Sequence, residues 1–328
     1  MIRRREFITL LGGAAAVAWP LAARAQQLGK SPRIGVLVSA SPPHPFADAF
    51  WRGLHALGYS EGRNIKVEFR YTDGRSDRAE EFAAAFVRSG VDVIVAHFNV
   101  ATRAAMGATR TIPIVMAAAG APLQQGLIDS LARPGGNVTG LSAMDAELGG
   151  KRLQLLRELM PNLLCIGVLA ATPATDGGYG EILVKDLDMA ATRAGLRLAP
   201  VLVEGPNEFE GAFEAMFKVG AQAVITQALF EPHGVILVEL ATKHHLALMS
   251  GTRQTTVAGG LVSMSSDFSA LYERAAFYVD KILNGAKPAD LPVEQPTKFQ
   301  VVLNMKTVQT LGLTAPPTLL AQINEVID

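Results

Sequence analysis

The chain has 328 residues, of which 49% are hydrophobic and 18% charged, and its formal net charge at neutral pH is zero. This length allows two globular lobes, and a neutral chain without a basic stripe interleaved with aromatics excludes a nucleic-acid-binding surface. The single cysteine, Cys165, lies in an apolar run, which excludes an internal disulfide and a cysteine-based metal cluster.

The first 25 residues have the pattern of an export signal. Arg3-Arg4-Arg5 precedes an apolar stretch, which ends in the A-x-A cleavage motif Ala23-Arg24-Ala25. The arginines also fit the twin-arginine export pattern, and the stretch is too short to span a membrane. We therefore expect cleavage after Ala25 and a soluble protein in the periplasm. Because no cysteine follows the cleavage point, we expect no lipid anchor there.

The first half of the mature chain alternates between strand and helix patterns. The expected strands cover 33–38, 65–69, 91–96, 112–116 and 138–141, and the expected helices 46–57, 79–89, 101–109 and the periodic segment 123–131. Continuous apolar strands are typical of a parallel sheet that is covered on both faces. The alternating order predicts a doubly wound α/β sheet.

One unit of this pattern, Thr111 to Ser142, has a loop of unusually small residues at 117–122. Side chains this small would let a ligand reach backbone N–H groups at the N-terminus of the helix expected to follow. The alternative is that the small residues only allow a tight turn.

The pattern repeats in the second half of the chain. The expected strands cover 166–170, 198–203, 223–226 and 247–249, and the expected helices cover 179–194, 209–219 and a segment ending near 243. Two such sheets predict two lobes, made of residues 31–141 with 264–297 and of residues 142–263 with 298–328. We expect three chain crossings between them, with a helix at 269–283 packed on the first lobe.

Ligands of open α/β sheets bind outside the carboxyl ends of the strands. The loops after the expected strands are therefore the predicted walls of a cleft between the lobes. Their candidate ligand-binding residues are the polar Ser39, Ser41, Asn99, Thr102 and Thr172, the charged Asp176, Arg253 and Asp267, and the aromatic Phe46 and Phe230. Either aspartate suits a ligand ammonium group. The alternatives are a solvated charge for the ionic residues and core packing for the aromatic ones.

The sequence has no recognisable catalytic or metal-binding motif. A G-x-S-x-G elbow, a Walker A loop, an H-E-x-x-H pair and a G-x-G-x-x-G turn after a strand are all absent, and the histidines lack ligand spacing. We therefore predict a protein that binds a small molecule, without enzymatic activity, cofactor or metal.

Several motifs distributed over the whole chain belong together. They include Gly53-Leu54 with Leu57-Gly58-Tyr59, Thr111-Ile112-Pro113-Ile114-Val115, Arg133-Pro134-Gly135-Gly136-Asn137-Val138-Thr139-Gly140, Lys151-Arg152-Leu153 and Pro288-Ala289-Asp290-Leu291-Pro292-Val293-Glu294-Gln295-Pro296-Thr297-Lys298-Phe299. With the export signal, they resemble a large family of ABC-transporter substrate-binding proteins. The similarity is to the type I periplasmic binding protein branch associated with uptake of tryptophan and related amino acids.

This resemblance implies two Rossmann-like lobes joined by three crossovers, the type I periplasmic binding protein fold. It places the ligand between residues 39–45, 99–102, Phe230, Arg253, a loop containing Ala119, Gly120 and Ala121, and a segment from Ser263 through Met264 to Asp267. The family's Gly-Asp-Pro is here Gly120-Ala121-Pro122, and its Ser-Tyr-Gly is Ser263-Met264-Ser265. Because these cleft positions differ, the ligand itself does not carry over. Met264 favours an adaptable apolar wall.

The sequence thus predicts the periplasmic, monomeric substrate-binding component of an ABC importer. We expect it to capture an amino acid or another small carboxylate by hinge closure and to deliver it to a membrane permease. Two alternatives remain: a ligand-binding partner of a periplasmic sensor, and an exported α/β enzyme.

Overall fold

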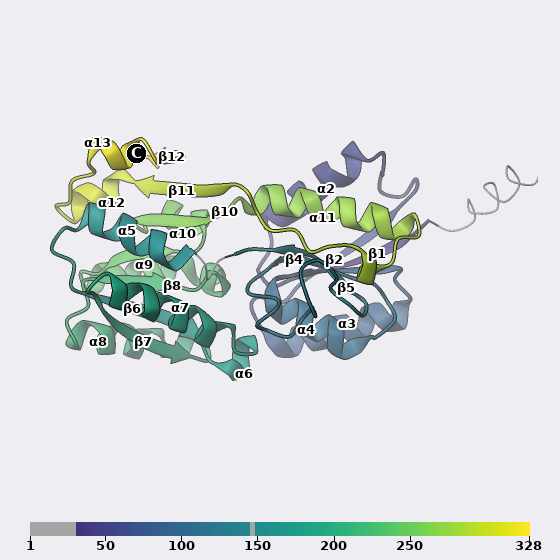
Figure 1. The fold of residues 1–328 in the computed structure, drawn as a ribbon, viewed down its shortest axis with the longest axis horizontal. Coiled ribbons are helices and arrows are strands. Elements are labelled where there is room, and N and C mark those ends of the chain that lie inside the picture. Colours follow the sequence, from purple (N-terminus) through teal and green to yellow (C-terminus); the bar gives the residue numbers. More distant parts are fainter. Residues whose placement is uncertain (1–30, 145–147) are drawn as a thin grey trace, which may run out of the picture.

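The computed structural model describes residues 31–144 and 148–328, so the predicted export signal lies outside the described residues. Two α/β lobes lie side by side along the longest axis of the molecule (Figure 1). Among the described helices, none combines the length and apolarity that crossing a membrane requires. The prediction of two Rossmann-like lobes is confirmed.

The first lobe contains a five-stranded parallel sheet in the order β2-β1-β3-β4-β5. Its strands are β1 (Arg33–Val38), β2 (Lys66–Tyr71), β3 (Val93–His97), β4 (Ile114–Ala119) and β5 (Val138–Ser142). One face packs on α2 (Pro45–Ala56) and α11 (Phe268–Leu283), and the other on α3 (Ser76–Ser89) and α4 (Phe98–Ala108). β1, β3, β4 and β5 are almost wholly buried, as continuous apolar runs require.

The second lobe contains a seven-stranded sheet in the order β12-β11-β10-β9-β8-β6-β7. Its strands are β6 (Cys165–Ala171), β7 (Arg197–Val203), β8 (Ala223–Thr226), β9 (Ala247–Ser250), β10 (Val262–Ser266), β11 (Phe299–Asn304) and β12 (Glu325–Ile327). β11 runs antiparallel to β10, whereas β6 to β10 are parallel. The predicted lobe boundary between 263 and 264 falls inside β10, which pairs only with strands of this sheet.

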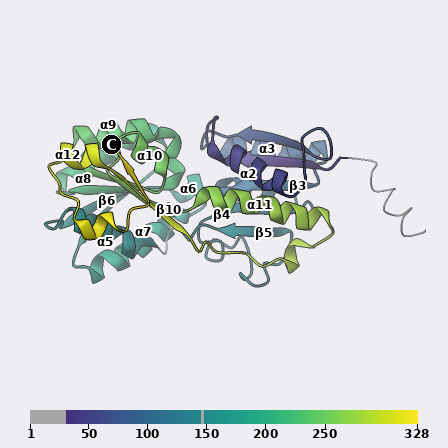
Figure 2. The ribbon, with the colours of Figure 1, turned by 90° about the horizontal axis from the view of Figure 1, so that it is seen from above.

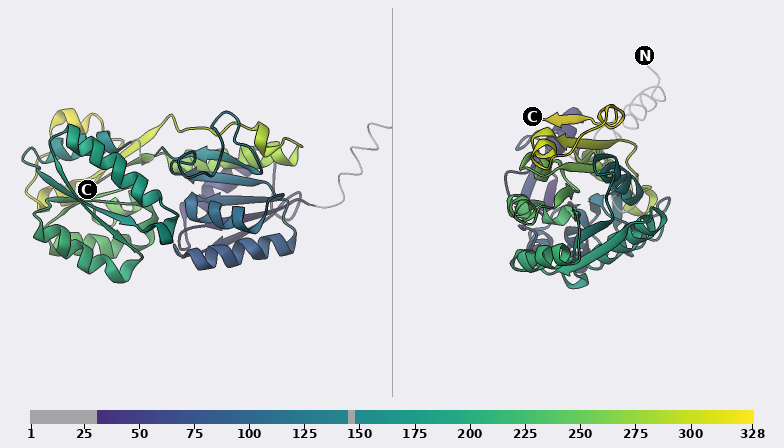
Figure 3. Two further views of the ribbon diagram at one scale, coloured as in Figure 1. Left: turned by 60° about the horizontal axis from the view of Figure 1, so that its bottom comes forward. Right: turned by 90° about the vertical axis from the view of Figure 1, so that its left-hand side faces the viewer.

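Helices cover both faces of the second sheet as well (Figure 2, Figure 3). The longer ones are α5 (Gly149–Leu159), α7 (Tyr179–Arg193), α8 (Phe209–Lys218) and α9 (Gly234–Lys243), and the shorter ones are α6 (Pro173–Asp176), η3 (Pro206–Glu208), η4 (Ala228–His233), α10 (Arg253–Val257), α12 (Met305–Thr310) and α13 (Pro317–Leu320). α6 and η4 occupy stretches that the sequence predicted as loops.

The chain passes between the lobes after β5, after β10 and before β11. The second and third passages enclose α11 and the short η5 (Pro288–Asp290), and α11 packs along α2 of the first lobe, as predicted (Figure 1). Buried residues of both lobes, Val100 and Leu229 among them, belong to one apolar cluster. The lobes are therefore in direct contact.

The helix predicted at 123–131 is wrong, because residues between β4 and β5 form turns instead. Gly126 has a φ of +64°, which ends the single turn that starts after Pro122. Leu127 and Ile128 are nevertheless buried in the core. The apolar spacing of this segment therefore indicated buried residues correctly, although the segment is not helical. The small-residue stretch at 117–122 is consequently not followed by a helix N-terminus.

Candidate ligand-binding site

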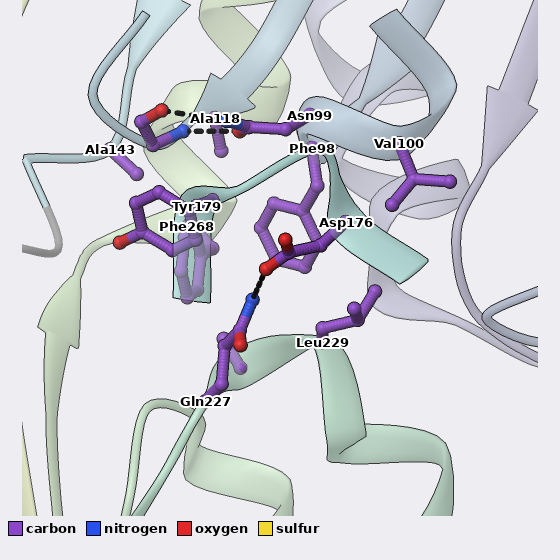
Figure 4. Close-up of a pocket in the computed structure, with 12 residues that line it drawn as sticks. Phe98, Asn99, Val100, Ala118, Ala143, Asp176, Tyr179, Gln227, Leu229 and Phe268 are labelled. Atoms are coloured by element: carbon purple, nitrogen blue, oxygen red, sulfur yellow. Dashed lines mark hydrogen bonds between the residues drawn. The ribbon is translucent and has the colours of Figure 1, made fainter. Parts of the chain in front are cut away.

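A cavity lies between the lobes, at the carboxyl ends of strands from both sheets (Figure 4). This is the position at which open α/β sheets bind their ligands. The first lobe contributes Phe98, Asn99, Val100, Ala118, Gly120, Ala143 and Phe268, and the second contributes Asp176, Tyr179, Gln227, Ala228 and Leu229.

The wall from the first lobe is built on unusual backbone conformations. Phe98 starts α4 directly after β3 with a φ of +62°, so the loop predicted at 97–100 does not exist. Ala118 and Ala121 have φ values of +65° and +44°. Side chains with a Cβ rarely adopt this region, and such strain concentrates at functional sites.

Aromatic rings and a helix end complete this wall. The Phe98 ring stacks on His97 with a centroid distance of 3.8 Å and meets Phe268 edge-on at 5.6 Å. The N-terminus of α4, which has no side-chain cap, is formed by the cavity-lining residues Phe98, Asn99 and Val100. Its backbone N–H groups carry partial positive charge.

Asn99 fixes the strand end opposite to it. Its side-chain amide donates to the carbonyl of Gly120 at 2.8 Å, and its amide oxygen accepts the N–H of Gly120 at 2.7 Å (Figure 4). Asn99 is 5% exposed, so both bonds are shielded from water. This pair holds the Gly120 segment at a defined distance from α4.

The wall from the second lobe carries a buried carboxylate, Asp176, which is 2% exposed. Its Oδ1 accepts the N–H of Gly178 at 2.9 Å, and its Oδ2 accepts the N–H of Gly180 at 2.7 Å. Oδ2 also accepts the side-chain amide of Gln227 at 2.8 Å (Figure 4). Burial raises the pKa of Asp176, and these hydrogen bonds partly oppose that shift. Gln227 is itself oriented by Ala171, whose N–H donates to its side-chain oxygen.

The cavity lining therefore combines one carboxyl group and two side-chain amides with mostly apolar side chains. Among the described residues that line it, Asp176 is the only carboxylic acid, and none is a lysine, arginine or histidine. The described residues also contain no group of three or more His, Cys, Asp or Glu side chains placed to hold a metal ion.

Direct contacts between the lobes surround this cavity. His44 Nε2 lies 3.5 Å from Oε1 of Glu231, and Arg103 Nη2 donates to the carbonyl of Gly177 at 3.2 Å. The ring of Tyr179, which comes from the second lobe, lies against Gly120 of the first. The lobes are closed over the cavity.

Three of the predicted ligand-binding residues line this cavity: Asn99, Gly120 and Asp176. Three more lie next to it without lining it. Ala119 is a buried residue at the end of β4, Ala121 packs against Tyr179, and Thr102 donates to the carbonyl of Phe98 within α4.

The predicted aromatic and apolar residues lie elsewhere. Phe46 is fully buried between α2 and α11, where it contacts Phe50 and Tyr272. Phe230 packs edge-on against Phe209 in the core of the second lobe. Met264 is buried in β10 as part of that lobe's other core cluster. Phe46 and Met264 are core residues, whereas Phe230 also lines a second cavity between the lobes, opposite Asp73 and Gly74.

The remaining predicted residues make structural contacts. The hydroxyl of Ser39 donates to the carbonyl of His97, Thr172 precedes α6, and Ser41 is half-buried in the loop after β1. Arg253 forms a two-bond ion pair with Glu325. Asp267 caps α11 by accepting the N–H of Ala270 at 3.0 Å. Asp267 does not line the cavity, although its neighbour Phe268 does.

Nine residues that line the cavity were not among the predicted ligand-binding residues: Phe98, Val100, Ala118, Ala143, Tyr179, Gln227, Ala228, Leu229 and Phe268. Gln227 directly follows β8, so it lies in one of the loops after strands that the sequence analysis predicted as walls of the cleft. Tyr179 and Phe268 begin helices, where periodicity alone does not show which first-turn side chains face another lobe. The useful signal is the pair of glycines before Tyr179, which makes the chain turn sharply at the strand end.

Comparison with known proteins agrees with this geometry. A family model described as "ABC transporter substrate binding protein" matches residues 34–327. A tyrosine-binding protein of Clostridioides difficile is 27% identical over 289 residues, which cover 87% of this chain and 82% of that protein.

Two solved structures have the same fold. The ABC domain from Streptococcus pneumoniae in complex with L-Trp superposes with a TM-score of 0.85 at 26% identity, covering 91% of this chain and all of that one. A conserved domain protein from Vibrio cholerae gives 0.82 at 26% identity, with 90% of this chain and all of the other covered.

Proposed function

The chain belongs to the ABC transporter substrate-binding protein family, and we propose that it captures an amino acid with an apolar side chain for import. The observation that carries this proposal is the cavity that lies between two lobes at the carboxyl ends of both sheets. Hinge closure of such lobes on a small molecule binds it without chemical change.

The polar groups of the cavity suit a zwitterion. Asp176 would bind the ligand ammonium group, because three neutral donors already orient its carboxyl group and an ammonium ion would supply the opposite charge. The N-terminus of α4 would accept the ligand carboxylate, because its partial positive charge is not used by a capping side chain. A carboxylate without an amine would face Asp176 with no compensating charge.

The apolar groups suit an aromatic or branched side chain. Phe98 and Phe268 from the first lobe and Tyr179 from the second offer ring surfaces around the cavity. The relative from Clostridioides difficile is described as binding tyrosine, and the Streptococcus pneumoniae domain is described in complex with L-Trp. These descriptions support an aromatic amino acid as the ligand of this chain too.

The remaining parts of the proposal follow from this role. The protein acts as an exported monomer in the periplasm, with its signal cleaved after Ala25, and delivers its ligand to an ABC permease. It needs neither cofactor nor catalysis: general acid–base chemistry requires paired titratable groups within hydrogen-bond reach, and Asp176 is engaged with backbone and amide donors of its own lobe.

Calorimetric titration of the protein from residue 26 onward tests this function. We expect saturable one-to-one binding of L-tryptophan, L-tyrosine or L-phenylalanine. Indole-3-propionate, which lacks the amine, should bind more weakly than L-tryptophan by roughly tenfold or more, since a hydrogen bond to a charged group is lost. Failure of every amino acid, in titration and in a thermal-shift screen, would contradict the proposal.

A further inference from the structure

We infer that the closed state is set by a reciprocal interlock of two glycines and two side chains: Tyr179 of the second lobe seats on Gly120 of the first, and Arg103 of the first seats on Gly177 of the second. This inference rests on the proposed binding function, which it extends by naming the contact that closes the cavity.

The first half of the interlock is the contact of Tyr179 with Gly120. A Cβ added to Gly120 would lie 2.5 Å and 2.6 Å from the Cε2 and Cζ atoms of the Tyr179 ring, far inside ordinary contact distance. The three atoms nearest to that Cβ position all belong to Tyr179. Glycine at 120 therefore makes room for a side chain of the other lobe.

The backbone conformation of Gly120 gives no other reason for glycine. Its φ lies outside the left-handed region, so an alanine at this position would not strain the backbone. The Asn99 bonds involve only the backbone of Gly120 and would persist. A methyl group here thus acts on the contact with Tyr179 alone.

The second half runs in the opposite direction. A Cβ added to Gly177 would collide with the Nε and Cδ atoms of Arg103, which belongs to α4 of the first lobe. Gln125 holds this guanidinium in place, because Arg103 Nη2 donates to the Gln125 side-chain oxygen at 2.6 Å and to its carbonyl at 2.8 Å. The same nitrogen donates to the carbonyl of Gly177 at 3.2 Å.

Both halves act on one short segment, residues 176–179. This segment carries Asp176, the carboxylate of the cavity, and Tyr179, a wall of the same cavity. Docking of the segment onto the first lobe therefore completes the cavity wall and delivers the carboxylate in a single movement. A residue that blocks docking would leave each lobe folded but the binding site incomplete.

The decisive variant is Gly120→Ala, measured by titration with L-tryptophan and L-tyrosine. We expect affinity to fall by about tenfold or more, the size of effect that overpacking of a tight contact produces. Tyr179→Ala removes the obstructing ring, so the double variant should bind no more weakly than Tyr179→Ala alone. Gly211→Ala, in α8 where an added Cβ meets open space, is the matched control and should bind like wild type.

Two results would overturn the interlock. One is a Gly120→Ala variant that binds as tightly as wild type, and the other is additive losses in the double variant, which would mean that the two residues do not meet. Circular dichroism and thermal melting of each variant separate loss of binding from loss of folding.

A second measurement does not depend on the ligand. A small diazirine-bearing aliphatic amino acid at position 179 is shorter than tyrosine and reacts with whatever it touches on illumination. In the ligand-free protein, we expect cross-links to the peptide that contains residues 117–121. Cross-links confined to second-lobe peptides would overturn the interlock, whereas failure of wild type to bind any amino acid while these cross-links form would contradict only the proposed function.

Discussion

The two walls of the cavity are built in different ways. The first lobe contributes shape: two phenylalanine rings, an uncapped helix end and a backbone with positive φ at Phe98, Ala118 and Ala121. The second lobe contributes charge: a buried carboxylate, Asp176, and the amide of Gln227 that holds it. The first lobe therefore contributes most of the shape, and the second lobe contributes the carboxyl group that distinguishes ligands with an amine from ligands without one.

This difference separates two kinds of specificity. Each strained residue costs on the order of 1–3 kcal/mol and persists only where its surroundings enforce it, as Asn99 does for the Gly120 segment. Asp176 needs no strain, because glycine N–H groups and Gln227 surround it. Changes in the first lobe should then affect all ligands alike, whereas changes in the second should affect ligands according to their charge.

The largest effect is expected from Asp176→Asn. Wild type should prefer L-tryptophan over indole-3-propionate by roughly tenfold to a hundredfold, and the variant should lose most of this preference, since a hydrogen bond to a charged group contributes about 1.5–3 kcal/mol. Titration of both ligands with both proteins gives a four-member cycle. The ratio of affinities, rather than either affinity alone, reports the ammonium contact.

A matched control removes a carboxylate that has no place in the cavity. Asp188→Asn, on the exposed side of α7, should leave both affinities unchanged. If Asp176→Asn weakens the two ligands by the same factor, the carboxylate supports the wall without contacting an amine, and the division between shape and charge fails.

A smaller effect is expected from Asn99→Ala. The variant loses two shielded hydrogen bonds to Gly120, so the strand end is free to move and affinity for L-tryptophan should fall by about tenfold. Because the change acts on shape, indole-3-propionate should weaken by the same factor. Asn284→Ala, at the exposed end of α11, is the control.

Unequal losses for the two ligands would contradict this prediction, since they would show that Asn99 senses the amine. The loss of affinity should also be accompanied by a lower melting temperature of the ligand-free protein. Both Gly120 bonds are buried, and an unsatisfied buried group destabilises the fold.

The fold was predictable because most of its strands are continuous runs of apolar residues in the sequence. Strand and helix patterns depend on neighbours in the chain, and these gave the element order of both lobes. The segment 123–131 is the exception. Its apolar spacing is that of a helix, but Gly126 takes a left-handed conformation, and Leu127 and Ile128 reach the core from turns.

The site was predictable only in part, because its geometry depends on packing. Asp176 was selected because a loop after a strand should reach the cleft, and it lines the cavity. Phe46 was selected as well, but its spacing with Phe50 and Leu54 follows the core-facing stripe of α2, and it does not line the cavity. The role of Tyr179 depends on its contact with Gly120 across the hinge, and the positive φ of Phe98 on the packing of its ring, neither of which a local pattern encodes.

The smallest expected effect concerns titration, in which the lobes again differ. Each lobe buries an ionisable group at or near the cavity. Burial raises the pKa of Asp176. Burial is also the main cause, and the electrostatic effect of the nearby His44 the second, that holds the pKa of His97 well below its usual 6.5. Below pH 6.5 the unfolded chain binds a proton at His97 that the folded chain does not, so this residue's contribution to stability falls as pH falls. The raised pKa of Asp176 acts in the opposite direction, favouring the folded state at low pH and losing that effect as pH rises above 3.8.

His97→Gln separates the two contributions. His97 Nε2 lies 2.8 Å from the hydroxyl of Tyr272, a bond that glutamine can replace without titrating. In urea unfolding of the ligand-free protein between pH 7 and 5, wild type should lose stability more steeply than the variant, by at most about 1.4 kcal/mol per pH unit. Absolute stability will change with the altered packing, so the comparison concerns the two slopes. Equal slopes would mean that folding does not lower the pKa of His97, and the contrast between His97 and Asp176 would then be wrong.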